Sequence, residues 1–243
     1  MKAMILAAGF GSRLRPLTDR VPKALVSVAG HPLIAYPLAL LRAAGIGEVV
    51  INLHHRGDLL RDALGTRAYG VAITYSEEAP ILDTGGAIRR AERWLAGERF
   101  VVLNADTLID LDLRPLLAWH AAHGGVATMV LRPDRETARY GAIEIDTGRR
   151  IRRFLGQPRT VDLPLTPLMF AGVHVFEPRV FDYLDHGAFG ITRQTYPRML
   201  AAGAPLYGYV YDGYWRVLDT HAGLAEGRHD LATRACLRPQ HVP

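Results

Sequence analysis

Short apolar runs, rich in β-branched side chains, recur along the first half of the chain at a length that suits buried strands. They occupy residues 3–7, 48–53, 71–75, 100–103 and 126–131. Between them lie stretches with the hydrophobic spacing of helices, at residues 33–44, 57–64, 84–95 and 113–123. This alternation predicts an α/β fold, with a mostly parallel sheet covered by helices. Gly45 and Gly65 are expected to end two of the helices, and Thr84 to cap the start of a third.

The second half has a different pattern. Strands are predicted at residues 142–145, 150–154, 170–176 and 206–211, and helices at residues 178–184, 193–202 and 220–233. Short turns between consecutive strands favour antiparallel pairing, so this half is expected to be an α+β lobe. No linker rich in Pro, Gly and Ser divides the chain. Residues 1–243 are therefore predicted to form one domain, with halves at residues 1–131 and 132–243.

Composition and charge limit the kinds of binding partner that this protein is expected to have. The 243 residues are 49% hydrophobic, which suffices for a full core and excludes disorder as the main state. No apolar run approaches the ~18 residues of a bilayer span, and no signal peptide is recognised, so no membrane partner is expected. The net charge of +5 comes mainly from scattered arginines, which favours small anions such as phosphates and predicts no nucleic-acid partner. The single cysteine, Cys236, excludes an internal disulfide and fits a cytoplasmic location. The oligomeric state is left open.

The loop after the first strand carries the most specific pattern. Residues 6–18 read LAAGFGSRLRPLT, and Pro22-Lys23 follows shortly after. A glycine-rich turn at the carboxyl end of a parallel strand lets backbone N–H groups approach phosphate oxygens. The loop is not a dinucleotide fingerprint, because Leu14 stands where the third glycine would be, and it lacks the Gly-Lys-Ser/Thr of a P-loop. Arg13 and Lys23 would add positive charge for phosphates.

The pattern G-x-G-x-R-x-x-P-L-T-x-x-x-P-K-x-L, from Gly9 to Leu25, resembles the nucleotidyltransferases that make nucleotide sugars from a nucleoside triphosphate (NTP) and a sugar 1-phosphate. The resemblance covers most of the chain. It implies a three-layer, Rossmann-like nucleotidyltransferase fold with a C-terminal sugar-binding lobe. It also implies that Arg13 contacts the β- and γ-phosphates and Lys23 contacts phosphate near the reacting centre, which makes both catalytic candidates. The residues expected to wrap the triphosphate are Ala8, Gly9, Gly11, Ser12 and Arg13.

The resemblance places base recognition in residues 76–86. Glu78 would face the Watson–Crick edge of the base, with the backbone of Asp83 and Gly85 nearby. An ionised carboxylate only accepts hydrogen bonds, so Glu78 suits uracil, thymine or guanine and disfavours adenine and cytosine. UTP, dTTP and GTP therefore stay open. The alternative is that Glu77 and Glu78 form a solvated acidic turn.

Two aspartates are metal candidates. Asp106 ends the fourth predicted strand, where ligands gather in open α/β sheets, and the resemblance implies that it holds Mg²⁺ against the α-phosphate; the alternative is a capping role. The family's second metal carboxylate lies two residues after a tryptophan, but this chain has Val217 there, which cannot bind Mg²⁺. Asp219 stands two residues further on. It would either replace the missing ligand, on the same face of a strand, or form the N-cap of the closing helix.

The sugar-phosphate pocket is expected, by resemblance, to include Asn104, Gly172 and Gly141, which follows Tyr140. His174 is expected to pack in the core or to line the pocket wall.

One family motif of this pocket is altered. Relatives often carry F-x-E-K-P, and this chain reads Phe-Leu-Gly-Gln-Pro at residues 154–158, so Gly156 and Gln157 replace both charged side chains. Arg153 or Arg159 is left to supply the positive charge.

The motifs together predict an Mg²⁺-dependent transfer of a nucleotidyl group from an NTP to a sugar 1-phosphate, giving a nucleotide sugar and pyrophosphate. UTP is favoured because residues 82–86 (LDTGG) are similar to those of short N-acetylmuramate-1-phosphate uridylyltransferases. Mannose-1-phosphate guanylyltransferase is the alternative, because Glu78 admits guanine, whereas a cytidylyltransferase is disfavoured. A non-catalytic nucleotide or nucleotide-sugar sensor is the alternative of another class. The loss of the family's charged side chains at Val217, Gly156 and Gln157 favours the sensor. The intact Arg13 and Lys23 oppose it, because a sensor has less need of a full triphosphate loop.

Overall fold

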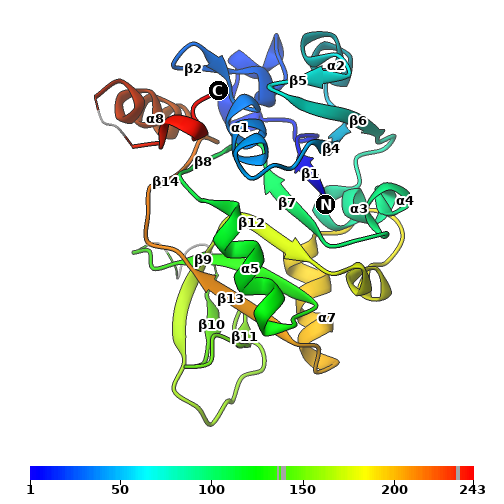
Figure 1. Ribbon diagram of the computed structural model, residues 1–243, viewed down its shortest axis with the longest axis vertical. Helices are drawn as coiled ribbons and strands as arrows, with labels where there is room; N and C mark the ends of the chain where they lie inside the picture. Colours follow the sequence, from blue (N-terminus) through cyan, green and yellow to red (C-terminus); the bar gives the residue numbers. More distant parts are fainter. Residues whose placement is uncertain (136, 138–140, 234–235) are drawn as a thin grey trace. The chain divides into compact units, whose positions relative to one another are not determined.

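Two compact units make up the protein, and their segments alternate along the chain (Figure 1). The computed structural model describes residues 1–243 except 136, 138–140 and 234–235. The first unit comprises Met1–Ile81, Leu103–Leu113 and Gly213–Pro243, and the second comprises Leu82–Val102 and Arg114–Asp212. The predicted division at residue 131 into nucleotide-binding and sugar-binding halves is a functional one and stays a prediction.

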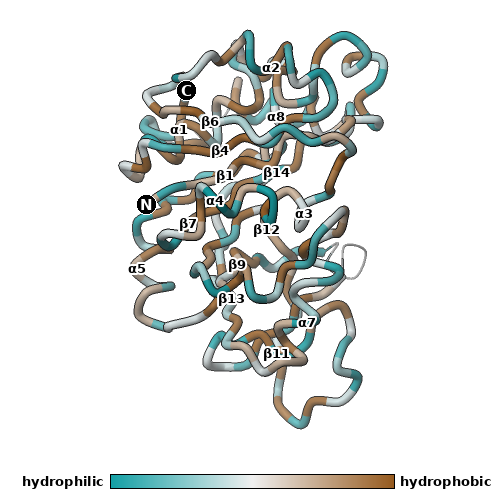
Figure 2. Tube along the Cα trace, turned by 90° about the vertical axis from the view of Figure 1, so that its right-hand side faces the viewer, coloured by the Kyte–Doolittle hydropathy of each residue, from teal (hydrophilic) through white to brown (hydrophobic). Residues whose placement is uncertain are grey.

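Parallel strands form the sheet of the first unit. β4 (Glu48–Leu53) lies between β1 (Lys2–Leu6) and β6 (Val71–Glu77) and runs parallel to both, while β5 (Arg67–Ala68) adds an antiparallel edge. Three predicted strands are thereby confirmed. Consecutive residues in the middle of β1 are fully buried, and β1 and β4 are largely brown in Figure 2. Both faces of the sheet are therefore covered, as parallel sheets require.

β7 (Phe100–Asn104) is the fourth predicted strand, and it crosses from the second unit into the first. Just beyond its end, the Ala105 N–H donates a hydrogen bond to the Leu6 carbonyl oxygen at 3.1 Å. This bond places the residues that follow β7 beside those that follow β1, where the candidate site lies.

The helices of the first unit lie close to the predicted positions. α1 (Ala35–Ala43), α2 (Gly57–Leu64) and α8 (His221–Thr233) confirm the helices expected there. After α1 the chain turns through Gly45, whose φ is +75°, as expected for a glycine that ends a helix. Of the helices that the structure describes, none has the length and apolar content of a membrane-spanning segment.

Two short strand pairs complete the first unit, and neither was predicted. β2 (Ser27–Val28) pairs with β3 (His31–Pro32), and β8 (Thr107–Ile109) pairs with β14 (Trp215–Val217), both antiparallel. A buried cluster joins the loop after β1 to the C-terminal segment through Leu14, Val26, Val28, Leu33, Tyr36, Leu108, Leu218, Leu224 and Leu237. The C-terminal segment thus helps to fix the loop.

The second unit has a mixed sheet. β9 (Ala127–Arg132) pairs antiparallel with β12 (Thr166–Phe176) and parallel with β13 (Leu206–Val210). β10 (Ile143–Ile145) pairs antiparallel with β12 and with β11 (Ile151–Phe154). The expected antiparallel pairing in this part of the chain is confirmed.

The helices of the second unit match the predictions less closely. α5 (Leu113–His123) lies where it was predicted. The expected helix at 193–202 is a π-helical turn, Ile191–Thr195, that leads into α7 (Tyr196–Ala201). The helix expected at residues 178–184 is a 3₁₀-helix, Pro178–Tyr183.

The single helix expected at 84–95 is two helices, α3 (Asp83–Arg90) and α4 (Glu92–Leu95), that meet at Ala91. The prediction that Thr84 caps this helix is wrong, because α3 begins one residue earlier. The Thr84 hydroxyl oxygen instead accepts a hydrogen bond from the Ile191 N–H at 3.0 Å. This tertiary contact replaces the local cap.

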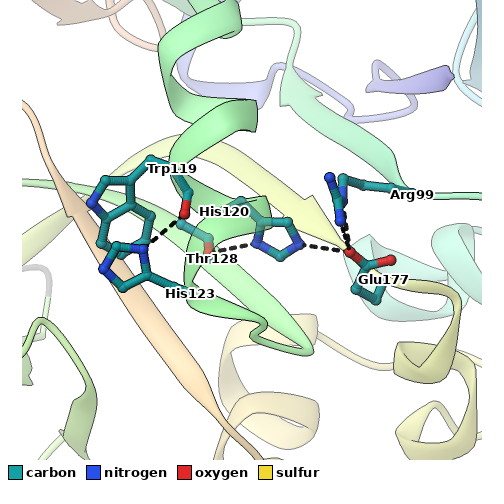
Figure 3. Close-up of polar contacts among 6 residues, drawn as sticks. All are labelled: Arg99, Trp119, His120, His123, Thr128 and Glu177. Atoms are coloured by element: carbon teal, nitrogen blue, oxygen red, sulfur yellow. Dashed lines mark hydrogen bonds and ion pairs between the residues drawn. The ribbon is translucent and has the colours of Figure 1, made fainter.

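A buried histidine links α5 to the sheet of the second unit (Figure 3). His120 is fully buried, and its Nδ1 and Nε2 lie 2.7 Å from the Thr128 hydroxyl and 3.2 Å from Glu177 Oε1. Arg99 Nε donates to the same Glu177 oxygen at 2.6 Å. Burial lowers the pKa of His120, so its neutral form is favoured. The pairing with Glu177, which sequence spacing did not indicate, gives this histidine a structural role.

Gly86 is expected to be intolerant of even one added methyl group. A Cβ there would lie 2.2 Å from the Gly187 carbonyl oxygen, so the backbone would have to move. We expect Gly86→Ala to lower the free energy of unfolding by about 1–3 kcal/mol, measured in urea. Gly97→Ala is the matched control, because a Cβ at Gly97 would meet no described atom within 4 Å. Equal stability of the two variants would contradict this account.

Candidate active site

A cavity of about 310 Å³ opens at the carboxyl ends of β1 and β7 and belongs wholly to the first unit. It brings together the predicted loop residues and both aspartates. Its lining consists of Leu6, Ala7, Gly9, Phe10, Gly11, Ser12, Arg13, Lys23, Ala24, Ala105, Asp106 and Asp219. Ala8, also predicted, is buried within the loop.

Gly11 explains why the loop closes over this cavity. Its φ is +63°, and a Cβ there would lie 2.8 Å from Thr18 Cγ2 and 3.1 Å from Lys23 Cβ. The Thr18 hydroxyl donates to the Gly11 carbonyl oxygen at 2.9 Å. At Gly9, by contrast, a Cβ would meet no described atom within 4 Å, so packing within the protein does not explain that glycine. The phosphate contact expected of Gly9 stays a prediction.

Lys23 and Asp106 form the inner ion pair of the cavity. Pro22 is extended and delivers Lys23 into a 3₁₀ turn, and Asp106 follows β7. Lys23 Nζ lies 2.5 Å from Asp106 Oδ2, with the two side chains 14% and 28% exposed. Both charges stay accessible to the cavity while each offsets the other.

Arg13 and Asp219 form a second, outer pair. Arg13 Nη1 lies 2.6 Å from Asp219 Oδ2, and the side chains are 67% and 15% exposed. The Leu218 N–H donates to the Asp106 carbonyl oxygen at 2.8 Å, which anchors Asp219 beside the inner pair. Two cations and two carboxylates therefore line one cavity.

Asp219 was considered either as a metal ligand or as the N-cap of the closing helix, and the structure tests the N-cap role. Thr220, not Asp219, caps α8, because its Oγ1 accepts the Gly223 N–H at 3.1 Å. The N-cap alternative for Asp219 is therefore wrong. Val217, at the family's usual aspartate position, pairs with Thr107 in the short ladder of β14 and β8.

The carboxylates suit Mg²⁺ in number and type. Among the described residues, no three His, Cys, Asp or Glu side chains gather to hold a metal by themselves. Mg²⁺ is usually held by one or two carboxylates, with substrate phosphates and water completing the shell. Asp106 and Asp219 in one cavity fit an ion that arrives with a nucleotide. Their metal roles stay predictions.

The two acidic residues after β6 differ in their surroundings. The Glu77 side chain is 65% exposed and pairs with Arg61, which matches the alternative of a solvated acidic turn. Glu78 is only 5% exposed, and its Oε1 accepts a hydrogen bond from Asn52 Nδ2 at 2.7 Å. The solvated-turn alternative therefore holds for Glu77 alone. Base recognition by Glu78 stays a prediction.

Asp83 and Gly85 belong to the second unit. Asp83 has a φ of +57°, and its Oδ1 accepts the Thr84 N–H at 2.6 Å. The Gly85 N–H donates to the Phe189 carbonyl oxygen at 2.8 Å, and a Cβ at Gly85 would lie 2.2 Å from the Phe189 ring. Packing thus accounts for this glycine. The nucleotide contacts predicted for Asp83 and Gly85 remain predictions.

The residues predicted for the sugar phosphate are spread over both units. Asn104 ends β7 in the first unit, half-buried. Gly141, with φ +91°, faces Leu155, and Gly172, with φ +88°, lies where the pairing of β12 with β9 shifts register. Tyr140 lies outside the described residues.

The altered motif at 154–158 is a tight hairpin turn. Phe154 and Gln157 exchange backbone hydrogen bonds, and the two residues between them, Leu155 and Gly156, both have positive φ. Glycine fits such a turn. Arg153 donates to Glu144 Oε2 at 2.9 Å, so the cation next to the turn already has a carboxylate partner.

Comparisons with known proteins agree with this geometry. The family model described as nucleotidyl transferase matches residues 2–234, so the chain belongs to the nucleotidyl transferase family. A mannose-1-phosphate guanyltransferase of Eremothecium gossypii is 35% identical over 221 residues, which are 88% of this chain and 60% of that protein. Mannose-1-phosphate guanylyltransferase 1 of Arabidopsis thaliana is 34% identical over 222 residues, with the same coverage. The chain thus spans about 60% of the length of these relatives.

Solved structures confirm the fold. A Bacillus anthracis protein assigned as a glucose-1-phosphate thymidylyltransferase superimposes with a TM-score of 0.81 at 24% identity, covering 99% of this chain and 98% of that one. A UDP-glucose pyrophosphorylase bound to UDP-glucose superimposes with a TM-score of 0.79 at 20% identity, covering 95% and 98%. The expected α/β nucleotidyltransferase fold with a mixed, mostly parallel sheet is therefore correct.

Proposed function

We propose that this protein transfers a nucleotidyl group from an NTP to a sugar 1-phosphate, releasing pyrophosphate. The supporting observation is the cavity in which a glycine-rich loop meets the pairs Lys23–Asp106 and Arg13–Asp219. A phosphate-binding loop with two cations suits a triphosphate, and two carboxylates suit the divalent ion that accompanies it.

In the proposed reaction, a phosphate oxygen of the sugar 1-phosphate attacks the α-phosphorus of the NTP. A new P–O bond forms there, the bond to the bridging α–β oxygen breaks, and pyrophosphate leaves with that electron pair. The nucleophile is already an anion, so no residue needs to remove a proton. Positioning and charge neutralisation supply the catalysis.

The residues of the cavity divide this work. Lys23, buried deeper than Arg13, would neutralise phosphate beside the reacting centre, and Arg13 would bind the outer phosphates. Asp106 would orient Lys23 and, with Asp219, hold Mg²⁺. Bound Mg²⁺ would neutralise phosphate charge and assist departure of pyrophosphate.

UTP, GTP and dTTP are the candidate nucleotides, and separate observations support the first two. The LDTGG pattern at residues 82–86 supports UTP, whereas the names of the relatives support GTP. A pyrophosphate-release assay that crosses UTP, GTP and dTTP with N-acetylmuramate, mannose and glucose 1-phosphates separates them. Turnover with one pair would identify base and sugar together. Nucleotide binding without turnover across this panel would favour the sensor alternative.

Asp219→Asn is expected to raise the concentration of divalent ion needed for half-maximal turnover by about tenfold, because one of two metal carboxylates is removed. Mn²⁺ binding in the presence of NTP, followed by electron paramagnetic resonance, should weaken in parallel. Asp62→Asn, on the exposed face of α2, removes the same charge and should change neither value. A higher KM for NTP with unchanged Mn²⁺ binding would mean that Asp219 orients Arg13 and does not hold the metal.

A further inference from the structure

We infer that Asn52 is a positioning residue that ties the start of the phosphate loop (residues 7–18, directly after β1) to the carboxylate of Glu78 and so sets base preference. This inference rests on the proposed function and adds a residue to it. Asn52 lies near the end of β4, and its buried amide contacts residues that follow both neighbouring strands.

The register of the sheet puts Asn52 between the two partners. β4 is the middle strand, so the end of β1 lies on one side of Asn52 and the end of β6 on the other. Asn52 Oδ1 accepts the Ala7 N–H at 2.7 Å, and Asn52 Nδ2 donates to Glu78 Oε1 at 2.7 Å. One amide therefore bridges the first residue after β1 and the first residue after β6.

Burial makes this bridge specific. Asn52 is 4% exposed and Glu78 is 5% exposed, so breaking the hydrogen bond between them would carry the cost of a buried polar group that is poorly satisfied. An amide offers both an acceptor for Ala7 and a donor for Glu78, and an aspartate or leucine cannot supply both. The chemistry of the position thus calls for an amide.

A second group of contacts supports the backbone of Glu78. The His54 ring, through Nδ1, lies 2.9 Å from the Glu78 carbonyl oxygen, and the Glu78 N–H donates to the Leu53 carbonyl oxygen at 2.8 Å. Phe10 of the phosphate loop packs edge-on against His54, with ring centroids 5.4 Å apart. These contacts hold the backbone of Glu78, and the bond from Asn52 orients its carboxylate.

The consequence is a link between two parts of nucleotide recognition. The triphosphate is expected at the loop that begins with Ala7, and the base at Glu78. A change at Asn52 should therefore alter discrimination between bases more than it alters affinity for the phosphates.

The test compares dissociation constants of UTP, GTP, ATP and inorganic tripolyphosphate for the full chain, measured by isothermal titration calorimetry. In Asn52→Asp, Oδ1 still accepts from Ala7, but a second carboxyl group faces Glu78, so the two either share a proton, which neutralises Glu78, or move apart, which displaces it. We expect the ratio of affinities for the preferred NTP and ATP to fall by about tenfold or more, the effect of losing one hydrogen bond to a charged group. Affinity for tripolyphosphate should change less than threefold. Asn52→Ala, which removes the donor without adding charge, carries the same expectation for the NTP/ATP ratio if Asn52→Asp does not fold.

Two further variants separate positioning from folding. Thr74 also lies on β6, opposite Val50 of β4, and its side chain is exposed, so Thr74→Val should leave both the NTP/ATP affinity ratio and the melting temperature unchanged. Asn52→Asp/Glu78→Gln exchanges donor and acceptor and should recover the melting temperature lost in Asn52→Asp. An unchanged NTP/ATP ratio in Asn52→Asp, or equal losses for NTP and tripolyphosphate, would overturn the inference. Wild-type protein that binds no NTP would instead overturn the proposed function, and the inference with it.

Discussion

Asp106→Asn is expected to lower kcat/KM by about 10²–10³-fold, the usual effect of removing one preorganised electrostatic group from an active site. The carboxylate lies 2.5 Å from Lys23 Nζ and is 28% exposed to the cavity. Asparagine has the same shape but cannot offset the lysine charge or bind Mg²⁺ strongly. The variant should fold normally, because the ion pair that it removes lines the cavity and is not part of the core.

Lys23→Met tests the same pair from the other side. It should cost a similar factor, and the double variant Lys23→Met/Asp106→Asn should lose far less than the product of the two, because both residues act as a unit. Steady-state kinetics on wild type, the two single variants and the double variant gives the coupling energy between Lys23 and Asp106. Asp62→Asn is the charge-matched control. Activity of Asp106→Asn within threefold of wild type would remove Asp106 from the proposed machinery.

The second large effect is a loss of stability in acid that depends on His174. This residue is 1% exposed, stacks on Phe170 with centroids 4.3 Å apart, and lies 2.8 Å through Nδ1 from the Tyr196 hydroxyl. Burial lowers the pKa of His174 from 6.5 to about 3. Of the two roles expected for His174, its burial matches packing in the core.

The sign of the effect follows from proton uptake. The unfolded chain binds a proton at His174 near pH 6.5, whereas the folded protein binds it only near pH 3. Between these values the unfolded state holds more protons, so stability falls as the pH falls through this window. From pH 7 to pH 4.5 this group alone should cost about 2–3 kcal/mol, given about 1.4 kcal/mol per pKa unit.

His174→Gln isolates this contribution, because glutamine does not titrate and can still bond the Tyr196 hydroxyl. The variant will be less stable at pH 7, but its loss between pH 7 and pH 4.5 should be smaller than that of wild type by about 2–3 kcal/mol in urea unfolding. His120, whose pKa burial also lowers, is present in both proteins and cancels. Parallel pH profiles for the two proteins would show that His174 is not kept neutral by burial.

Local signals in the sequence predicted most of the regular structure. The bounds of α2 and α5 were predicted correctly, because each helix is followed directly by a glycine, Gly65 or Gly124. The strand pair β8 and β14 was missed, since three-residue strands show no period and their partners lie far apart in the sequence. At Thr84, a hydrogen bond from the distant Ile191 N–H takes the hydroxyl oxygen that the sequence predicted would cap the helix.

The candidate site divides in the same way. Gly9, Gly11, Arg13 and Lys23 were found because their motif is contiguous, but the pairing of Arg13 with Asp219 joins opposite ends of the chain. Asn52 was missed, although a single amide in the otherwise apolar run VVINL was a usable signal. A buried polar residue in a strand needs partners, and only the fold shows which ones.

Transfer of label from α-³²P-NTP tests the central claim most directly. The full chain is incubated with Mg²⁺, labelled UTP or GTP and a sugar 1-phosphate, and products are separated. We expect label in a nucleotide sugar, unlabelled pyrophosphate in equal amount, and no label transfer without the sugar phosphate. Labelled nucleoside monophosphate formed by water, or bound nucleotide that is never converted with any sugar phosphate of the panel, would contradict it.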